Sequence, residues 1–202
     1  ADSYAMLEKI GLTRYVNEFA KNLPYGAQRR VEMARAMVIQ PKVLLLDEPF
    51  SHIDHFRKNI LRRRLFAYLK DHDIACIVAT HDSTDALSFA DKTIVLKNAK
   101  IYAEDAPSEL YQNPPNKYVA SLFGDVNELM LKDLVEDESS RKKVILYPEE
   151  IKLSKTSGIK ATVEKSWFKG ETWLIEASLN GNTVYFNHSQ GLKEGKKINL
   201  KV

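Results

Sequence analysis

Four consecutive apolar residues that end in two acids constrain this chain more than any other feature. Val43-Leu44-Leu45-Leu46 is followed by Asp47 and Glu48, and Pro49 stops the run. A short, branched apolar run is typical of a buried strand in a parallel sheet. Open α/β sheets place their ligands beyond the carboxyl ends of such strands. The sequence therefore predicts a buried parallel strand with two carboxylates at a ligand-binding edge.

The two acids have different expected roles, because successive side chains of a strand point to opposite faces. Asp47 suits a hard divalent cation, typically Mg²⁺ held partly through water. Glu48 points the other way and can polarise a water molecule beside that cation. Taken alone, a buried strand that ends in surface acids explains the same residues.

Motif-like segments flank this strand in a fixed order. Upstream lies Leu23-Pro24-Tyr25-Gly26-Ala27-Gln28, at the start of a helix expected over about 27–39. Downstream lie Ser51-His52-Ile53-Asp54 and, after a second apolar strand over 74–79, Thr80-His81-Asp82. This order resembles the ATP-binding subunits of ABC transporters. The segments match the signature motif, the Walker B strand with its glutamate, the D-loop and the H-loop histidine of that family.

The resemblance implies ATP and Mg²⁺ as ligands and suggests a role for each matched residue. Glu48 is then the catalytic base, His81 a hydrogen-bond partner of the γ-phosphate, and Asp47 the Mg²⁺ ligand. In the family two copies face each other, and each ATP lies between one P-loop and the other copy's signature. The matched residues for this second contact are Tyr25, Gly26 and Gln28 of the signature and Asp54 of the D-loop.

The signature segment departs from the usual Leu-Ser-Gly-Gly-Gln. Pro24 stands in the serine position, Tyr25 in that of the first glycine, and Ala27 in that of the glutamine. Pro24 has neither a hydroxyl nor an N–H group to donate, whereas Gly26 still permits a close approach of the backbone to phosphate. Two interpretations stay open, a functional variant of the motif and a weakened phosphate contact.

The phosphate-binding loop of the family is absent from the 202 residues, which contain no Gly-x-x-x-x-Gly-Lys-(Ser/Thr). That loop follows a strand and wraps the phosphates with backbone N–H groups. Gly191–Lys197 is one residue short and has no hydroxyl after its lysine. The resemblance therefore implies the C-terminal portion of an ATPase subunit, and this chain alone is predicted to be inactive. A non-catalytic regulatory, dimerisation or ligand-sensing module is the alternative.

A change in composition predicts two domains, 1–126 and 127–202. The first is expected to be α/β, part of a P-loop NTPase (ABC ATPase) domain with a mainly parallel sheet. Beyond a charge-rich stretch the apolar residues alternate, and Asn180-Gly181 is a strong hairpin turn. Leu146–Leu153 resembles a segment of the TOBE regulatory domain, an OB-like β domain that follows the ATPase in importers for oxyanions, ferric iron, polyamines and sugars.

Nucleic acid is not an expected partner. The formal net charge is only +3, and the run Arg62-Arg63-Arg64 on a helix over about 55–70 is expected to form a solvated face. An oligonucleotide-binding barrel is the alternative for the second domain. Its stacking aromatics, whose alternation instead favours core positions, would be Trp167, Phe168, Trp173 and Tyr185.

The resemblance also implies the cellular setting. The partners are a second ATPase subunit, permease subunits in the membrane and, indirectly, a solute-binding protein, with the chain peripheral at the cytoplasmic face of the cell membrane. No apolar run in the sequence is long enough to cross a bilayer. Residues 4–10 and 14–20 predict two short helices separated by Gly11. They are interpreted either as part of the subdomain that docks on the permease or as a simple packing hairpin.

Overall fold

A computed structural model describes residues 3–51, 53–134 and 142–202. His52 and the charge-rich segment 136–140 lie outside these ranges. The chain forms two compact units, 1–89 and 90–202. The predicted domain division between residues 126 and 127 lies inside the second unit and stays a prediction.

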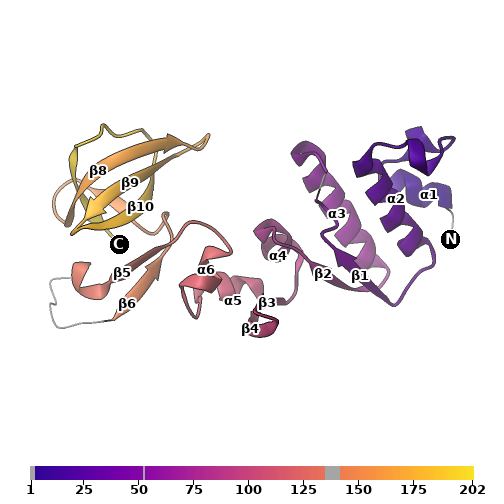
Figure 1. Ribbon diagram of the computed structural model, residues 1–202, viewed down its shortest axis with the longest axis horizontal. Coiled ribbons are helices and arrows are strands. Elements are labelled where there is room, and N and C mark those ends of the chain that lie inside the picture. Colours follow the sequence, from indigo (N-terminus) through magenta and orange to yellow (C-terminus); the bar gives the residue numbers. More distant parts are fainter. Residues whose placement is uncertain (1–2, 52, 135–141) are drawn as a thin grey trace. The chain divides into compact units, whose positions relative to one another are not determined.

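The first unit is built on a pair of parallel strands. β1 (Val43–Asp47) pairs with β2 (Ala75–Ala79), and Asp47 lies opposite Ala79. Figure 1 shows α2 (Tyr25–Val38) and α3 (His55–Asp71) beside this pair. Leu44 and Leu46 of β1 share one buried core with side chains of both helices, among them Met37 and Leu65. The expected helix over 55–70 and the expected second strand are confirmed.

The opposite face of the pair is exposed. Val43 is 61% exposed, Leu45 72% and Ile77 62%. The prediction of a strand buried on both faces is therefore wrong for the described residues, because side chains alternate and the core lies on one side only. Parallel sheets normally have both faces covered. Among the described strands, only β1 and β2 pair in parallel, so the prediction of a mainly parallel sheet is confirmed for this pair and not for the other strands.

The segment before α2 is less helical than its pattern suggests. α1 (Ser3–Lys9) forms as expected, but residues 14–20 contain no α-helix, and short 3₁₀ turns lie at Thr13–Tyr15 and Ala20–Asn22. α2 begins at Tyr25, two residues earlier than expected, so Gly26 lies in its first turn. The chain then passes from α3 through β2 to α4 (Ser83–Phe89).

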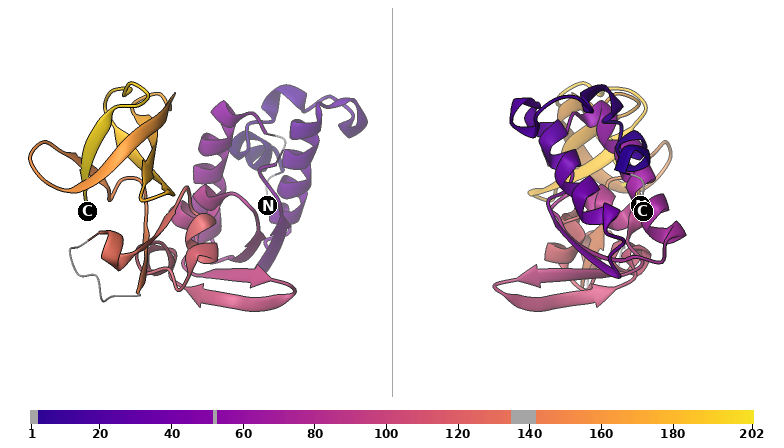
Figure 2. Two further views of the ribbon diagram at one scale, coloured as in Figure 1. Left: turned by 60° about the vertical axis from the view of Figure 1, so that its left-hand side comes forward. Right: turned by 90° about the vertical axis from the view of Figure 1, so that its right-hand side faces the viewer.

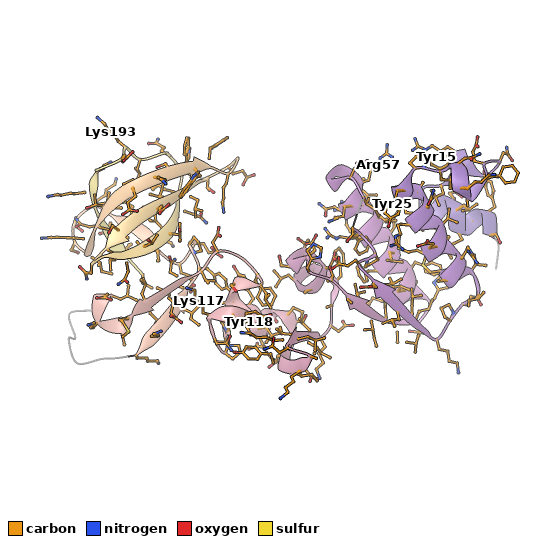
Figure 3. All side chains as sticks on the ribbon, in the orientation of Figure 1. Tyr15, Tyr25, Arg57, Lys117, Tyr118 and Lys193 are labelled. Atoms are coloured by element: carbon orange, nitrogen blue, oxygen red, sulfur yellow. The ribbon has the colours of Figure 1, made fainter. Side chains whose placement is uncertain are left out.

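The second unit begins with a hairpin and two short helices. The hairpin consists of β3 (Thr93–Lys97) and β4 (Lys100–Asp105). α5 (Pro107–Gln112) and α6 (Lys117–Ser121) follow, and Figure 3 labels Lys117 and Tyr118 on α6. A small buried cluster of Val95, Leu110 and Val119 joins these elements.

An antiparallel sheet in the order β10-β9-β8-β11-β7 makes up most of the remainder. Figure 2 shows it curling into a half-barrel, and its inner face is a core in which Ile175, Ala177 and Phe186 are fully buried. A separate pair, β5–β6, lies beside it. The strands are β5 (Asn127–Met130), β6 (Lys143–Leu146), β7 (Lys152–Ser154), β8 (Ile159–Phe168), β9 (Trp173–Leu179), β10 (Asn182–His188) and β11 (Lys197–Lys201).

The predicted core positions of the aromatic residues are wrong on β8. Trp167 is 41% exposed and Phe168 64%. The register between β8 and β9 shifts between Val163 and Lys165. A bulge of this kind reverses the inward and outward alternation of later residues, which turns Trp167 outward; it does not account for the exposure of Phe168. Trp173 and Tyr185, on the neighbouring strands, are partly buried.

The segment that resembles a TOBE domain packs on the short helices of the same unit. The ring of Tyr147 stacks on that of Tyr111 with centroids 4.5 Å apart, and its hydroxyl donates to the Ala120 carbonyl. Glu150 accepts from the backbone N–H of Tyr147 at 2.6 Å, and Ile151 is buried. Burial raises the pKa of the Tyr147 hydroxyl to about 12. These contacts explain why 90–126 and the β strands form one compact unit.

Candidate functional site

Glu48 and His81 meet at the carboxyl ends of the two parallel strands. The backbone N–H of Glu48 donates to the Ala79 carbonyl at 2.9 Å, which continues the β1–β2 pairing by one residue. The carboxylate oxygen Oε1 lies 2.5 Å from His81 Nδ1 and accepts from the His81 backbone N–H at 3.1 Å. Oε2 accepts from the Ser51 hydroxyl at 2.9 Å. The parallel pairing thus brings together the two predicted catalytic residues.

This contact changes the protonation of both groups. Partial burial would raise the pKa of Glu48, but hydrogen bonds from His81 and Ser51 outweigh it and lower that pKa below 4.5. The hydrogen bond to Glu48 raises the pKa of His81 above 6.5. The His81 side chain is 81% exposed, so the imidazole remains accessible to a ligand. The pair therefore offers one carboxylate and one accessible imidazole, whose protonation is favoured by that carboxylate, at an open edge.

Asp47 lies at the same edge but makes neither of these contacts. It is exposed and belongs to the uncovered face of β1 with Val43 and Leu45. Glu48 adopts a positive φ of 46°, a conformation that is strained for a residue with a Cβ and is concentrated at functional sites. The chain thus turns at Glu48, which separates the two carboxylates as the sequence predicts.

A buried arginine fixes the loop that carries His81. Arg62 of α3 is only 2% exposed. Its Nη2 lies 2.5 Å from the carboxylate of Asp82, and its Nε lies 2.5 Å from that of Asp85. Asp85 also accepts from the Thr80 hydroxyl at 2.7 Å. The residues on both sides of His81 are therefore anchored to a single guanidinium group.

The hydrogen bonds around Arg62 favour the ionised form of the Asp82 carboxylate. Burial would raise the pKa of Asp82, but hydrogen bonds from Arg62 and Lys58 hold that pKa well below its usual range. The Lys58 ammonium lies 3.1 Å from the Asp82 carboxylate. The Arg62 guanidinium also lies over the Phe50 ring, 5.3 Å from its centroid. The Asp82 carboxylate therefore stays ionised over the ordinary pH range.

Sequence analysis missed this role of Arg62, since the three arginines were expected to form a solvated face. Arg63 and Arg64 are exposed, as expected. A signal was present, because Arg62 precedes the buried Leu65 and Leu69 by three and seven residues and so lies on the same helical face. A charge on a buried stripe needs a partner, and Asp85 is that partner.

The predicted signature residues lie in the first turn of α2. Gly26 and Tyr25 open the helix, and the Gln28 amide donates to the Leu23 carbonyl at 2.8 Å. The Tyr25 ring is half exposed and its hydroxyl accepts from Arg29 at 3.1 Å. The structure therefore places these residues at a helix N-terminus.

Asp54 occupies the N-cap position of α3. Its carbonyl accepts from the backbone N–H groups of Arg57 and Lys58 at 2.9 and 3.0 Å, while its carboxylate makes no capping hydrogen bond. The side chain is exposed. The carboxylate is therefore available for a contact outside the helix.

Comparison with known proteins agrees with the motif order. The family model for ABC transporters matches residues 1–51. The spermidine/putrescine import ATP-binding protein PotA of Ureaplasma parvum serovar 3 is 30% identical over 215 residues, which cover 96% of this chain and 41% of that protein. The chain belongs to the family of ABC transporter ATP-binding subunits. The sulfate/thiosulfate import ATP-binding protein CysA of Pseudomonas syringae pv. tomato is 33% identical over 152 residues, which cover 75% of this chain and 44% of that protein.

The family members extend well beyond the aligned region. PotA of Malacoplasma penetrans is 33% identical over 198 residues, which cover 87% of this chain and 33% of the relative. The chain thus spans less than half the length of these three relatives. The solved structure of cbiO1 from Clostridium perfringens, part of the ABC transporter complex cbiONQ, aligns with 55% of this chain and 44% of that chain at 27% identity. Its TM-score of 0.49 is too low to bear on the fold.

Two further structural facts bear on ligands and location. Within the described ranges, no three His, Cys, Asp or Glu side chains gather into a group that could hold a metal ion by itself. Among the helices described, none has the length and apolar character of a membrane span.

Proposed function

We propose that this chain is part of an ATPase subunit that powers solute import through membrane permease subunits. The observation that carries the proposal is the Glu48–His81 contact at the carboxyl edge of β1 and β2, with Asp47 beside it. Open α/β sheets bind ligands at this edge. Two relatives that match three quarters or more of the chain are import ATP-binding proteins for spermidine/putrescine and for sulfate/thiosulfate.

In this proposal Glu48 is the general base. Its lowered pKa keeps the carboxylate ionised, so that it can accept a proton from a water molecule that attacks the γ-phosphate. The imidazole of His81 is largely exposed, its pKa is raised by the contact with Glu48, and it donates a hydrogen bond to the phosphate oxygens. Arg62 is a positioning residue, since it holds the chain on both sides of His81.

Asp47 fits a Mg²⁺ ion that takes most of its ligands from groups other than protein side chains. A single exposed carboxylate at a strand end suits this ion, which usually takes its remaining ligands from substrate phosphates and water. The ion would neutralise charge on the phosphates. Tyr25, Gly26 and Gln28 at the start of α2 and Asp54 before α3 would contact the ATP and the D-loop of a second copy.

The exposed face of β1 and β2 supports the proposal that a further polypeptide segment packs there and completes the ATP site. Val43, Leu45 and Ile77 form an apolar surface where α/β proteins carry further structure. A P-loop segment packed there would reach the carboxyl edge. We expect no ATP turnover from this chain by itself, and residues 127–202 would act as an OB-like TOBE domain. The assembly would lie peripherally on the cytoplasmic face of the membrane.

The test measures ATP hydrolysis and ATP binding in the assembled transporter purified from cells. In Glu48→Gln we expect hydrolysis to fall by about 10²–10⁴-fold, the usual contribution of a general base, while binding of a photoreactive ATP analogue is retained. Glu32→Gln, at an exposed glutamate of α2, is the matched control and should hydrolyse ATP normally. Unchanged turnover in Glu48→Gln would remove the proposed base. ATP hydrolysis by the isolated chain would contradict the proposal that a further segment is needed for activity. Failure of the assembled transporter to bind ATP would favour the alternative, a non-catalytic regulatory module.

A further inference from the structure

Four arginines line one groove of the first unit, and neither Glu48 nor His81 is among its lining residues. The arginines are Arg14, Arg30, Arg57 and Arg64, and the groove they line has a volume of about 350 Å³. Its remaining walls are apolar and include Ile10, Ile53 and Ile60. Figure 3 shows Arg57 at the same end of this unit as Tyr15 and Tyr25.

Arg30 is the least exposed of these arginines, and backbone carbonyls accept its hydrogen bonds. Arg30 donates from Nη1 to the carbonyls of Ile10 and Gly11 at 3.2 and 3.1 Å, and from Nε to that of Gly26 at 3.1 Å. A Cβ placed on Gly11 would lie 3.6 Å from Arg30 Nη1 and 3.9 Å from Arg64 Nη1. The two guanidinium groups therefore flank Gly11, and part of the groove is preorganised.

Arg57 and Arg14 lie close enough to Arg30 to act on its charge, and Asp54 is the acidic group that opposes them. Within the described part of the chain, none of these guanidinium groups forms an ion pair with Asp or Glu. Burial and the nearby charge of Arg57 lower the pKa of Arg30. Arg14 acts in the same direction, whereas Tyr15 and Asp54 oppose the shift. Like charges this close destabilise one another until a counter-charge binds.

We propose that this groove binds a soluble, phosphorylated small molecule. A volume of 350 Å³ is at the lower end of the range for small-molecule sites, which is about 300–1,000 Å³. Guanidinium groups match phosphate oxygens in pairs. A diphosphate carries enough charge to neutralise several arginines at once, whereas a single carboxylate does not. The apolar wall suits an organic group attached to the phosphate.

The experiment is a calorimetric titration of the purified chain with inorganic pyrophosphate at low salt and in the presence of EDTA. EDTA removes divalent ions from Asp47 but leaves His81, so the comparison of Arg57→Gln with its control is what assigns binding to the groove rather than to the proposed ATP edge. We expect saturable binding of one pyrophosphate. Arg57→Gln should weaken it by about tenfold or more, as expected for the loss of a charged hydrogen-bond donor.

Arg63→Gln is the matched control, because Arg63 is an exposed arginine of the same helix outside the groove. It should bind pyrophosphate like the unaltered chain. Without pyrophosphate, Arg57→Gln should melt at a higher temperature than Arg63→Gln at low salt, since it relieves repulsion within the groove. Equal weakening by both substitutions, or no binding at all, would overturn the proposal. Equally tight binding of a glutamate peptide, or binding only to vesicles of anionic lipid, would also overturn it.

Discussion

Replacing Arg62 by methionine tests the anchor beneath the candidate site. Arg62→Met keeps an unbranched side chain of similar length against Phe50 but removes the guanidinium group. The carboxylate of Asp85, which is 4% exposed as a residue, then loses its 2.5 Å partner. Asp82 loses its own 2.5 Å contact with the same group. The substitution therefore leaves one buried carboxylate without a counter-charge.

The expected cost follows from how well each carboxylate is compensated. Breaking a buried ion pair by removing one partner costs about 3–5 kcal/mol. Asp85 keeps a hydrogen bond from Thr80 at 2.7 Å, which offsets part of this. The Asp82 side chain is 25% exposed and keeps the Lys58 ammonium at 3.1 Å. Solvent therefore screens this carboxylate, and the loss of its contact with Arg62 costs less. We expect a loss near the lower limit, about 3 kcal/mol of unfolding free energy for the first unit.

The assay is urea unfolding followed by two probes. Both tryptophans, Trp167 and Trp173, lie in the second unit, so their fluorescence reports on that unit, whereas helical circular dichroism is dominated by the first. Arg62→Met should move the circular dichroism transition and leave the fluorescence transition in place. Arg63→Met, at the exposed neighbour, should change stability by no more than about 0.5 kcal/mol. A similar effect of both substitutions would refute the anchoring role of Arg62.

Two further predictions concern the Glu48–His81 pair and a glycine of the second unit. The pKa of His81 is raised above 6.5 and that of Glu48 lowered below 4.5, so their contact contributes fully between these pH values. It is lost at higher pH as His81 deprotonates and at lower pH as Glu48 is protonated. Proton NMR should show the pKa of His81 falling toward 6.5 in Glu48→Gln, and an unchanged value would contradict the contact. Gly158 has a φ of +145°, and a Cβ there would lie 2.3 Å from the Leu200 carbonyl oxygen. Gly158→Ala should therefore destabilise the second unit by about 1–3 kcal/mol, read by tryptophan fluorescence, whereas Gly124→Ala, with open space around it, should have little effect.

The candidate site was predictable because its parts lie where strands end. The apolar runs before Asp47 and Thr80 predict two strands, and parallel pairing then brings their carboxyl ends together. Figure 1 shows β1 and β2 side by side, and Glu48 and His81 are consequently in contact. A local pattern was sufficient to predict this contact, because the same short run of residues defines the end of each strand and the polar residue that follows it.

Other features depend on partners that a local pattern does not name. The burial of Arg62 follows from Asp85, which lies more than twenty residues away. The outward position of Trp167 follows from a bulge at residues 163–165 that no turn residue announces. The helix expected over 14–20 has apolar residues at helical spacing, yet Phe19 is 74% exposed and only short 3₁₀ turns form around it.

The uncovered face of β1 links the stability of the chain to the chemistry proposed for it. Val43, Leu45 and Ile77 are each more than 60% exposed, and full burial of such a side chain stabilises a protein by about 1.5–3 kcal/mol. Covering all three would contribute roughly 3–6 kcal/mol after allowance for what is already buried. Asp47 lies on this same face, at the end where a P-loop segment would approach. A segment that completes the phosphate site would therefore also stabilise the first unit, and ATPase activity and resistance to urea should appear together when it binds.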